Sequence, residues 1–450
     1  MKQSFNAINF IKIYFDENRK GVYLDGRFLE FKKLQQIAKS IKLINKKFKN
    51  GRLTTDAQKE QANKIKELLQ KKKFEKLTSV LQIVEQKIEA KDYTVTMLTK
   101  IVRGKTVYTI DRTNIVVFFI LKQIQKNIEN SFKVKQSDRN EIIGQVINMI
   151  DNSFPKYIIR TDIASFYESI PHDKLKDVIN RNYILNNTSK RIIYEILRQY
   201  TMLTGLEKGI PRGIGISAYL AELYMRDFDT SMKNLSNTTY YTRYVDDIIL
   251  IFTPDTKYDN INYKEKVNEK LESFGLTMNV SKTKEINLFI PNNYNFEFLG
   301  YRFDFSNKLN IDISNSKKLR YKQKMELAFD DYNKESKYNE KKSRKLLIKR
   351  LSYLTGNTRL LGVKKDILIG MYFSNQQIID MKTLSNLDNV LRYSMINSKL
   401  TPYSKLTYIN LANLKMKLNK FSFVDGFQNK KFYKFTRNDL EEILKIWKTI

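Results

Sequence analysis

The sequence predicts an α+β fold in which a small antiparallel sheet carries closely spaced acidic side chains. Residues 240–252 are typical of a hairpin, because apolar and β-branched residues flank the adjacent carboxylates of Asp246 and Asp247. A second apolar run ends at Asp162 and continues into an aromatic-rich helical start. Long stretches on both sides of these acids carry apolar residues at helical spacing, so we expect helices to flank the sheet.

The amino-terminal part of the chain predicts a helical region over residues 1–95. Residues 30–92 are rich in Lys and Glu, and apolar residues recur within them at helical spacing. We favour a solvated charged face on a small helical bundle over direct contact with nucleic acid. The apolar positions that support these helices are Ile65, Leu68, Leu69, Leu77, Val80, Leu81, Val84 and Ile88.

The adjacent carboxylates need a physical reason, because like charges repel and a simple turn usually takes Asn-Gly or Asp-Gly. An isolated Asp-Asp pair would be read as a solvated acidic turn. Here Asp162 also ends an apolar run, where a carboxylate needs a partner. Mg²⁺ takes oxygen ligands and requires only a few carboxylates. One Asp from a strand and one or two from a neighbouring hairpin therefore predict a metal site, with Mn²⁺ as the alternative ion.

A glycine-rich loop precedes an amphipathic helix between the two acidic sites. Three of the 15 glycines lie between residues 209 and 215, including Gly213. Glycine lets a backbone approach a flat or anionic ligand closely, and the start of a helix offers free N–H groups. Such loops are common before helices, so this signal is weak alone.

Five segments in order resemble the palm motifs and the primer-gripping hairpin of reverse transcriptases. This resemblance covers roughly residues 96–305 and implies a right-hand polymerase fold with a helical, thumb-like carboxy-terminal region. The segments are residues 162–167, 209–217, 244–247, 274–284 and 296–303. The implied organisation is a helical region at 1–95, fingers at 96–150, a palm at 151–305 and a thumb-like region at 306–450.

The glycine loop is similar to that of prokaryotic defence-associated reverse transcriptases, the abortive-infection and "unknown group" enzymes. Retron and group II intron enzymes typically read Pro-Gln-Gly and then Ser-Pro-Leu-Leu-Ala-Asn. Here Arg212 stands in place of the Gln, and Ser-Ala-Tyr-Leu-Ala-Glu replaces the second block. This departure puts ordinary template handling in doubt, because the loop normally packs near the templating base.

The resemblance implies roles for the acidic residues and for one lysine. Asp162 and Asp246 would be the main metal ligands, Asp247 a third, and the Ile163 carbonyl a backbone ligand. Two ions would activate a primer 3′-hydroxyl and stabilise the pyrophosphate leaving group. Lys282 follows the next palm motif, where it would balance charge on the pyrophosphate and donate a proton to it.

Further residues are assigned to the incoming nucleotide and to the primer by the same resemblance. Tyr167 would be the aromatic gate that excludes a ribose 2′-hydroxyl, with packing in the palm core as its alternative role. Arg139 is a weaker phosphate candidate. The residues expected to bind dNTP are Lys100, Arg103, Lys105, Tyr167 and Gly213. The expected primer grip is Phe298, Leu299, Gly300 and Tyr301.

Charge and composition agree with a polyanionic partner and exclude several other chemistries. Lys plus Arg number 81 against 48 acids, which gives a net charge of +33. Without Cys, disulfides and thiolate zinc sites are excluded, and His172 is the only histidine, for which we expect a structural role. The longest apolar run, residues 115–121, is too short to span a bilayer. We therefore expect a cytoplasmic protein without membrane contact.

The expected function is an RNA-directed DNA polymerase that takes dNTPs, an RNA template and a DNA product, in antiviral (anti-phage) defence. The template could be an associated noncoding RNA, and a homo-oligomer or a companion reverse transcriptase could take part. The alternatives are a retron- or intron-like enzyme that copies a dedicated RNA, and a template-independent polymerase. A catalytically silent RNA-binding scaffold is disfavoured, because Asp162, Asp246 and Asp247 are all present.

Overall fold

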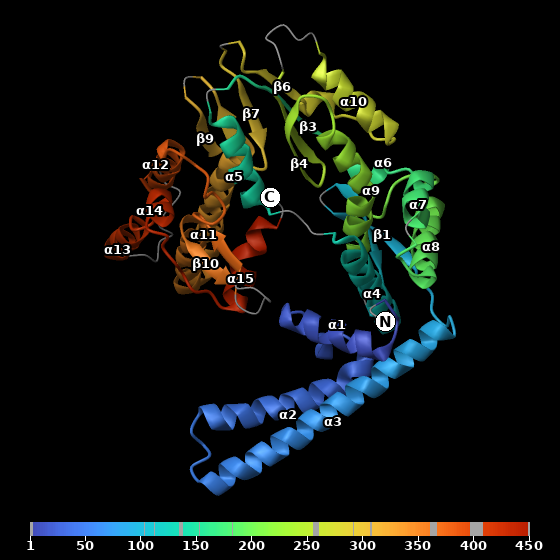
Figure 1. Ribbon diagram of the computed structural model, residues 1–450. Coiled ribbons are helices and arrows are strands. Elements are labelled where there is room, and N and C mark those ends of the chain that lie inside the picture. The colour runs from blue at the N-terminus through green and yellow to red at the C-terminus, as the bar shows by residue number, and fades with distance from the viewer. Residues whose placement is uncertain are drawn as a thin grey trace. The chain divides into compact units, whose positions relative to one another are not determined.

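The computed structural model is a mixed helix and sheet protein with antiparallel sheets (Figure 1). It divides into two compact units, each described here by itself. The first unit comprises Met1–Gln136, Ile163–Met232 and Lys266–Met278, and the second comprises Ser137–Asp162, Lys233–Glu265 and Asn279–Ile450. The structure describes residues 3–102, 104–111, 113–134, 138–152, 154–181, 183–254, 261–290, 292–306, 308–360, 367–396 and 408–448.

The first unit begins with three helices and two short 3-10 turns. The Asn6 side chain caps the first helix, and a capping box between Thr55 and Gln58 starts the third. Helices α2 and α3 pack against each other as a long hairpin (Figure 1), so the predicted helices are confirmed. The elements are α1 Ala7–Arg19, η1 Leu24–Gly26, η2 Leu29–Phe31, α2 Lys32–Lys49 and α3 Asp56–Glu89.

The rest of the first unit is one antiparallel hairpin and a group of helices. The apolar run predicted at residues 115–121 becomes the start of α4, and residues 115–120 are all buried. Within the described ranges, no helix is long and apolar enough to cross a membrane. The elements are β1 Met97–Val102, β2 Lys105–Ile110, α4 Ile115–Phe132, α6 Phe166–Ser169, α7 His172–Arg181, α8 Asn187–Thr204 and α9 Gly215–Lys233.

The glycine loop is held by backbone hydrogen bonds within the first unit. The Ile210 N–H donates to the Tyr167 carbonyl at 2.7 Å, and the Tyr108 N–H donates to the Arg212 carbonyl at 2.6 Å. Gly213 has φ +102°, and an added Cβ would lie 2.6 Å from the Tyr108 carbonyl oxygen. Glycine is therefore required at 213 by both backbone conformation and space.

His172 supports the same loop and has the structural surroundings that its sequence context suggested. It is 3% exposed, its Nε2 lies 2.6 Å from the Gly209 carbonyl oxygen, and its Nδ1 lies 3.2 Å from the Thr201 hydroxyl. Burial lowers the pKa of His172, which favours the neutral ring. The imidazole therefore ties α7 and α8 to the loop.

The second unit contains an antiparallel sheet, as the sequence predicted, and the structure gives it four strands in the order β4-β5-β3-β6. Residues 248–252 of β5 are buried without interruption, because the strand is central. The Tyr263 ring stacks on Phe252 with centroids 4.2 Å apart. The elements are α5 Arg139–Ile150, β3 Tyr157–Asp162, β4 Thr238–Tyr244, β5 Asp247–Phe252, η3 Val280–Lys282 and β6 Lys284–Asn287. Helix α10 Tyr263–Ser273 begins in the second unit, and its residues from Lys266 onward belong to the first.

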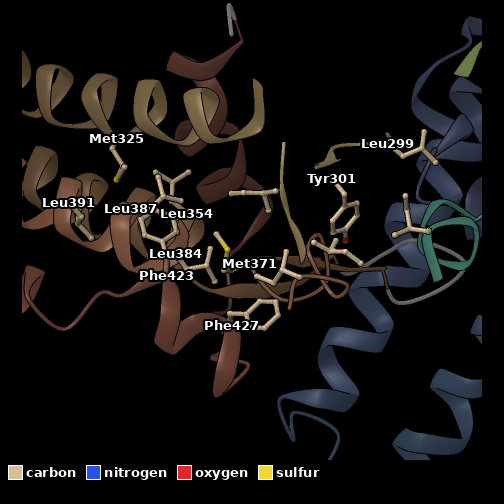
Figure 2. Close-up of a cluster of buried hydrophobic side chains, with 14 of the residues drawn as sticks. Leu299, Tyr301, Met325, Leu354, Met371, Leu384, Leu387, Leu391, Phe423 and Phe427 are labelled. Atoms are coloured by element: carbon tan, nitrogen blue, oxygen red, sulfur yellow. The ribbon is translucent and has the colours of Figure 1, made fainter. Parts of the chain in front are cut away.

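A three-stranded sheet and the carboxy-terminal helices share one core in the second unit (Figure 2). Met325 and Leu354 of α11 contribute to this core together with Phe423 and Phe427 of α14. The predicted helical character after residue 306 is found, with the ladder β10–β11 in addition. The elements are β7 Asn295–Phe298, β8 Tyr301–Asp304, β9 Asn310–Ile313, α11 Asn315–Thr355, β10 Asn357–Leu360, β11 Ile367–Gly370, α12 Lys382–Ile396, α13 Tyr408–Leu418, α14 Phe423–Gln428, α15 Arg437–Leu444 and η4 Lys445–Trp447.

We predict that Gly213→Ala destabilises the protein by about 2 kcal/mol or more, because strain and overlap with the Tyr108 carbonyl add together. Gly104→Ala is the matched control. Gly104 has φ +70° but no atom within 4 Å of an added Cβ, so about 1 kcal/mol of strain is expected alone. Urea unfolding of both variants measures the difference, and equal losses would contradict the close approach.

Candidate active site

The acidic residues converge at one end of the four-stranded sheet. Asp162 is the last residue of β3 and Asp247 is the first of β5, and the two are direct partners across the antiparallel ladder. Asp246 precedes Asp247 in the hairpin turn. Asp162 is 5% exposed, whereas Asp246 and Asp247 are half-buried. The pairing of β3 with β5 therefore brings Asp162 to the turn that carries Asp246 and Asp247.

The turn that carries Asp246 has a strained backbone. Tyr244 and Asp247 are paired, so Val245 and Asp246 form a two-residue turn. Val245 has φ 61°, a left-handed conformation that a β-branched residue rarely adopts. The Arg243 guanidinium donates to the Val245 carbonyl at 2.8 Å and helps to hold this conformation. Strain of this kind costs on the order of 1–3 kcal/mol and fixes where the following carboxylates lie.

Two cations are paired with the acids. The Lys282 ammonium lies 2.7 Å from Asp162 Oδ2, and the Arg160 guanidinium lies 2.6 Å from Asp247 Oδ1. Arg160 also donates to the Lys282 carbonyl at 3.0 Å. The sequence analysis missed Arg160, although a residue two before Asp162 on a strand lies on the same face.

The electrostatics of the cluster disfavour the ionised form of one acid. Burial raises the pKa of Asp247 above its usual range, and the charges of Asp246 and Asp162 add to this rise. Arg160 and Lys282 act in the opposite direction, but the rise prevails. The fold therefore holds carboxylates together against desolvation and repulsion.

The donor set fits a hard divalent cation. Asp162 Oδ1 is buried and has no hydrogen-bond partner among the described residues. Carboxylate oxygens are the ligands that Mg²⁺ prefers, and a cation would relieve the repulsion that raises the Asp247 pKa. In the described part of the chain, no three His, Cys, Asp or Glu residues are already arranged to hold a metal ion. Lys282 is paired with Asp162 Oδ2 and Arg160 with Asp247 Oδ1, and a metal ion would bind these carboxylates alongside the two cations.

Ile163, the proposed backbone ligand, directly follows β3 and belongs to the first unit. It forms an isolated antiparallel bridge with Met278, and the neighbouring Ala164 N–H donates to the Thr277 carbonyl at 2.9 Å. Its backbone is therefore held in place, and its role as a ligand stays a prediction.

Tyr167 lies in the first unit beside the unusual arginine of the glycine loop. Its side chain is half-buried, and the Arg212 guanidinium lies 5.6 Å from the ring centroid. Arg212 Nε is also 3.4 Å from Glu168 Oε1. Arg212 thus contacts the segment that carries the proposed sugar gate, which sequence reasoning did not foresee.

The other described nucleotide candidates of the first unit lie on or beside the β1–β2 hairpin. Lys100 on β1 and Lys105 on β2 are exposed, and residues 98–102 of β1 are exposed throughout. Arg103 lies outside the described residues. Gly213 packs against the backbone of Tyr108 on β2, so its proximity to this hairpin is explained without a ligand.

The hairpin proposed to grip the primer is formed by β7 and β8 in the second unit. Leu299 and Gly300 have φ 46° and 76°, as a type I′ turn requires. Phe298 and Tyr301 are 1% and 0% exposed, so these side chains anchor the hairpin in the core. Arg139 donates to the Leu299 carbonyl at 2.7 Å and lies 5.2 Å from the Tyr301 ring centroid. Leu299 is buried as well, so Gly300 is the one residue of the four that is partly exposed.

A family model described as "Reverse transcriptase (RNA-dependent DNA polymerase)" matches residues 111–303. This range contains both β3 and the acidic hairpin. The chain carries a reverse transcriptase domain. The description of that family names an RNA-dependent DNA polymerase, which is a nucleotidyltransferase activity. No curated protein matches the chain.

Solved telomerase structures are among those similar to the chain. Apo telomerase from Candida tropicalis is 13% identical, with a TM-score of 0.39, over 79% of this chain and 62% of that one. Telomerase from Candida albicans with a fragment of telomeric RNA is 11% identical, with a TM-score of 0.32, over 73% of this chain and 53% of that one. The chain thus spans less than two thirds of the length of either telomerase.

We predict that Arg160→Gln raises the pH at which half of the metal binding is lost on acidification. Asp247 takes up a proton at a higher pH than an ordinary Asp, so a metal ion held by it would be lost as pH falls through that raised pKa. Removing Arg160 removes the largest influence that lowers this pKa. Mn²⁺ binding followed by electron paramagnetic resonance, from mildly acidic to neutral pH, measures the midpoint.

Arg302→Gln is the matched control, since Arg302 pairs with Asp304 at 3.2 Å on β8. It should leave the midpoint of metal binding unchanged. A midpoint in Arg160→Gln that stays at the wild-type pH would contradict the proposed coupling.

Proposed function

We propose that the whole protein is an RNA-directed DNA polymerase that makes DNA from dNTPs by two-metal nucleotidyl transfer. The observation that carries this proposal is the pairing of Asp162 with Asp247 across β3 and β5, with Asp246 in the adjoining turn. These acids lie within the matched reverse transcriptase domain. Carboxylates on two neighbouring strands can present oxygens to the same ions.

Asp162, Asp246 and Asp247 would hold Mg²⁺, or Mn²⁺ as the alternative, with the Ile163 carbonyl as a further ligand. The ions would activate the primer 3′-hydroxyl and stabilise the leaving pyrophosphate. Lys282 would balance charge on the pyrophosphate and donate a proton to it. Its position 2.7 Å from Asp162 supports a place beside the reacting phosphates.

The incoming dNTP would be contacted by Lys100, Lys105, Tyr167 and Gly213, and by Arg103, which lies outside the described residues. The primer would be met by the turn at Leu299 and Gly300, with Phe298 and Tyr301 as its anchors. The roles of Tyr167, Gly213 and the primer-grip residues rest on the order of the motifs and on the family match, whereas the three basic residues before residue 111 lie outside the matched range and rest on the resemblance alone.

The biological setting is proposed from the glycine loop. Arg212 in place of Gln supports a defence-associated enzyme. We place this enzyme in the cytoplasm, where it would copy an RNA template. An associated noncoding RNA is one choice of template. The contact of Arg212 with the Tyr167 ring gives the substitution a physical role. Sequencing the nucleic acid that co-purifies with the protein separates this proposal from a retron- or intron-like enzyme and from a template-independent one. The molar mass of the same sample, measured by light scattering, tests whether the protein forms a homo-oligomer or binds a companion subunit.

We expect the double variant Asp246→Asn with Asp247→Asn to lower dNTP incorporation by about 100-fold or more, because the metal ligands are lost. Its melting temperature without Mg²⁺ should hold or rise, because ionised Asp247 is disfavoured in the fold. Primer extension on an RNA template and thermal unfolding measure the two effects. The control is Asp304→Asn, an acid of β8 outside the cluster. Unchanged incorporation in the double variant would refute the assignment.

We expect Tyr167→Val to reduce discrimination against NTPs by about 10-fold or more, because a smaller side chain leaves room for a 2′-hydroxyl. Extension assays with mixed dNTP and NTP substrates measure the ratio. Tyr194→Val is the control, since Tyr194 is also half-buried and bonds Asn180 on the same unit. Retained discrimination would assign Tyr167 to packing.

A further inference from the structure

Helix α2 carries an unusual charge distribution. Its 18 residues include seven lysines and no acid. All seven lysines are exposed, and among the described residues none of them takes part in an ion pair. The seven are Lys32, Lys33, Lys39, Lys42, Lys46, Lys47 and Lys49.

The neighbouring helix α3 shows how a solvated charged helix is usually built. It interleaves acids with lysines, and Lys59 and Lys64 pair with Asp56 and Glu60 on their own helix. Such pairs at three- and four-residue spacing support a helix, whereas like charges at this spacing oppose it. In α2 the repulsion among lysines has no such compensation, so an external anion would relieve it.

The lysines of α2 occupy one side of the helix. Lys39, Lys42, Lys46 and Lys49 recur at three- and four-residue spacing and therefore lie along one face. With a rise of 1.5 Å per residue, successive members of this row are about 4.5 to 6 Å apart along the axis. This lysine row can therefore contact several phosphates of one backbone.

The opposite side of α2 is apolar and packs against the rest of the first unit. Ile37, Ile41, Ile44 and Phe48 are half-buried, Leu34 is buried, and α2 packs against α3 (Figure 1). A helix that lies on a membrane needs a free apolar face. The one apolar residue exposed among the lysines is Leu43, so a lipid surface is disfavoured.

The lysine row also lacks the groups that bind unpaired bases. Single-stranded nucleic acid is bound through stacking on aromatic side chains, and the only aromatic residue of α2 is the half-buried Phe48. Base-paired RNA is recognised instead by its shape and its backbone phosphates. In place of the solvated face that the sequence favoured for residues 30–92, we propose that the lysine row of α2 docks on the phosphate backbone of a base-paired RNA stem. The choice of RNA over another polyanion rests on the proposed function.

The test compares two variants of the full chain that lose the same charge. The first replaces Lys39, Lys42, Lys46 and Lys49 by Gln, which keeps helix propensity. The control replaces four exposed lysines of the second unit by Gln, namely Lys417, Lys420, Lys434 and Lys445. The probe is a fluorescent RNA hairpin with a stem of about 16 base pairs, a length that a double-stranded RNA-binding domain spans.

We expect the α2 variant to bind the hairpin RNA about 10- to 100-fold more weakly at physiological salt, and the slope of log K against log salt to fall by about 3 to 4. The control should change affinity less than about threefold. Equal losses in both variants would reduce the effect to net charge and overturn the proposal. Unchanged RNA binding would overturn the proposal too. In that case, a loss of self-association in the α2 variant would assign the lysine row to a second copy of the chain. A loss of binding to anionic phosphatidylserine vesicles would assign it to a lipid surface.

The test of RNA docking on α2 can be told apart from the test of the polymerase activity. The α2 variant should extend a short primer–template at the wild-type rate, whereas the Asp246→Asn, Asp247→Asn variant should bind hairpin RNA normally. A wild-type protein that incorporates no dNTP but loses hairpin binding in the α2 variant would refute the polymerase assignment and leave the RNA site standing.

Discussion

The ladder between β3 and β5 is the constraint on which the candidate active site depends. It places Asp162 directly opposite Asp247, so one register of one strand pair decides whether the carboxylates meet. A shift of one residue would turn every side chain of a strand to the other face of the sheet. Residues 248–252 are apolar and buried on both faces, and the charged Asp247 lies at the edge of this buried run.

The same ladder explains why cations surround the acids. A carboxylate at the end of a buried strand is desolvated, and neighbouring carboxylates raise the free energy of its ionised form further. Arg160 and Lys282 offset part of this penalty from the strand and from the 3-10 turn before β6. The cluster is thus a set of partly compensated charges into which a divalent cation would fit.

Much of this arrangement could be predicted from the sequence, because it is local. The strand ending at Asp162, the acidic turn and the glycine loop before α9 follow from short-range patterns, whereas the hairpin around Gly300 is expected from the family resemblance. The position of Arg160 on the same face as Asp162 could be read from the strand, but its pairing with Asp247, 87 positions away on another strand, could not. Likewise, the sequence could not show that Phe298 and Tyr301 point into the core, or that Arg212 contacts the Tyr167 ring.

The left-handed conformation of Val245 links stability to alignment. Glycine at this position would adopt the same backbone without strain and would make the turn easier to form. It would also permit many other backbone conformations, so the two carboxylates that follow would lose their fixed direction. A β-branched residue forced into this conformation has few alternatives once the strands have paired. The hairpin therefore gives up some folding free energy and, in return, keeps its acids in a single orientation before any ligand arrives.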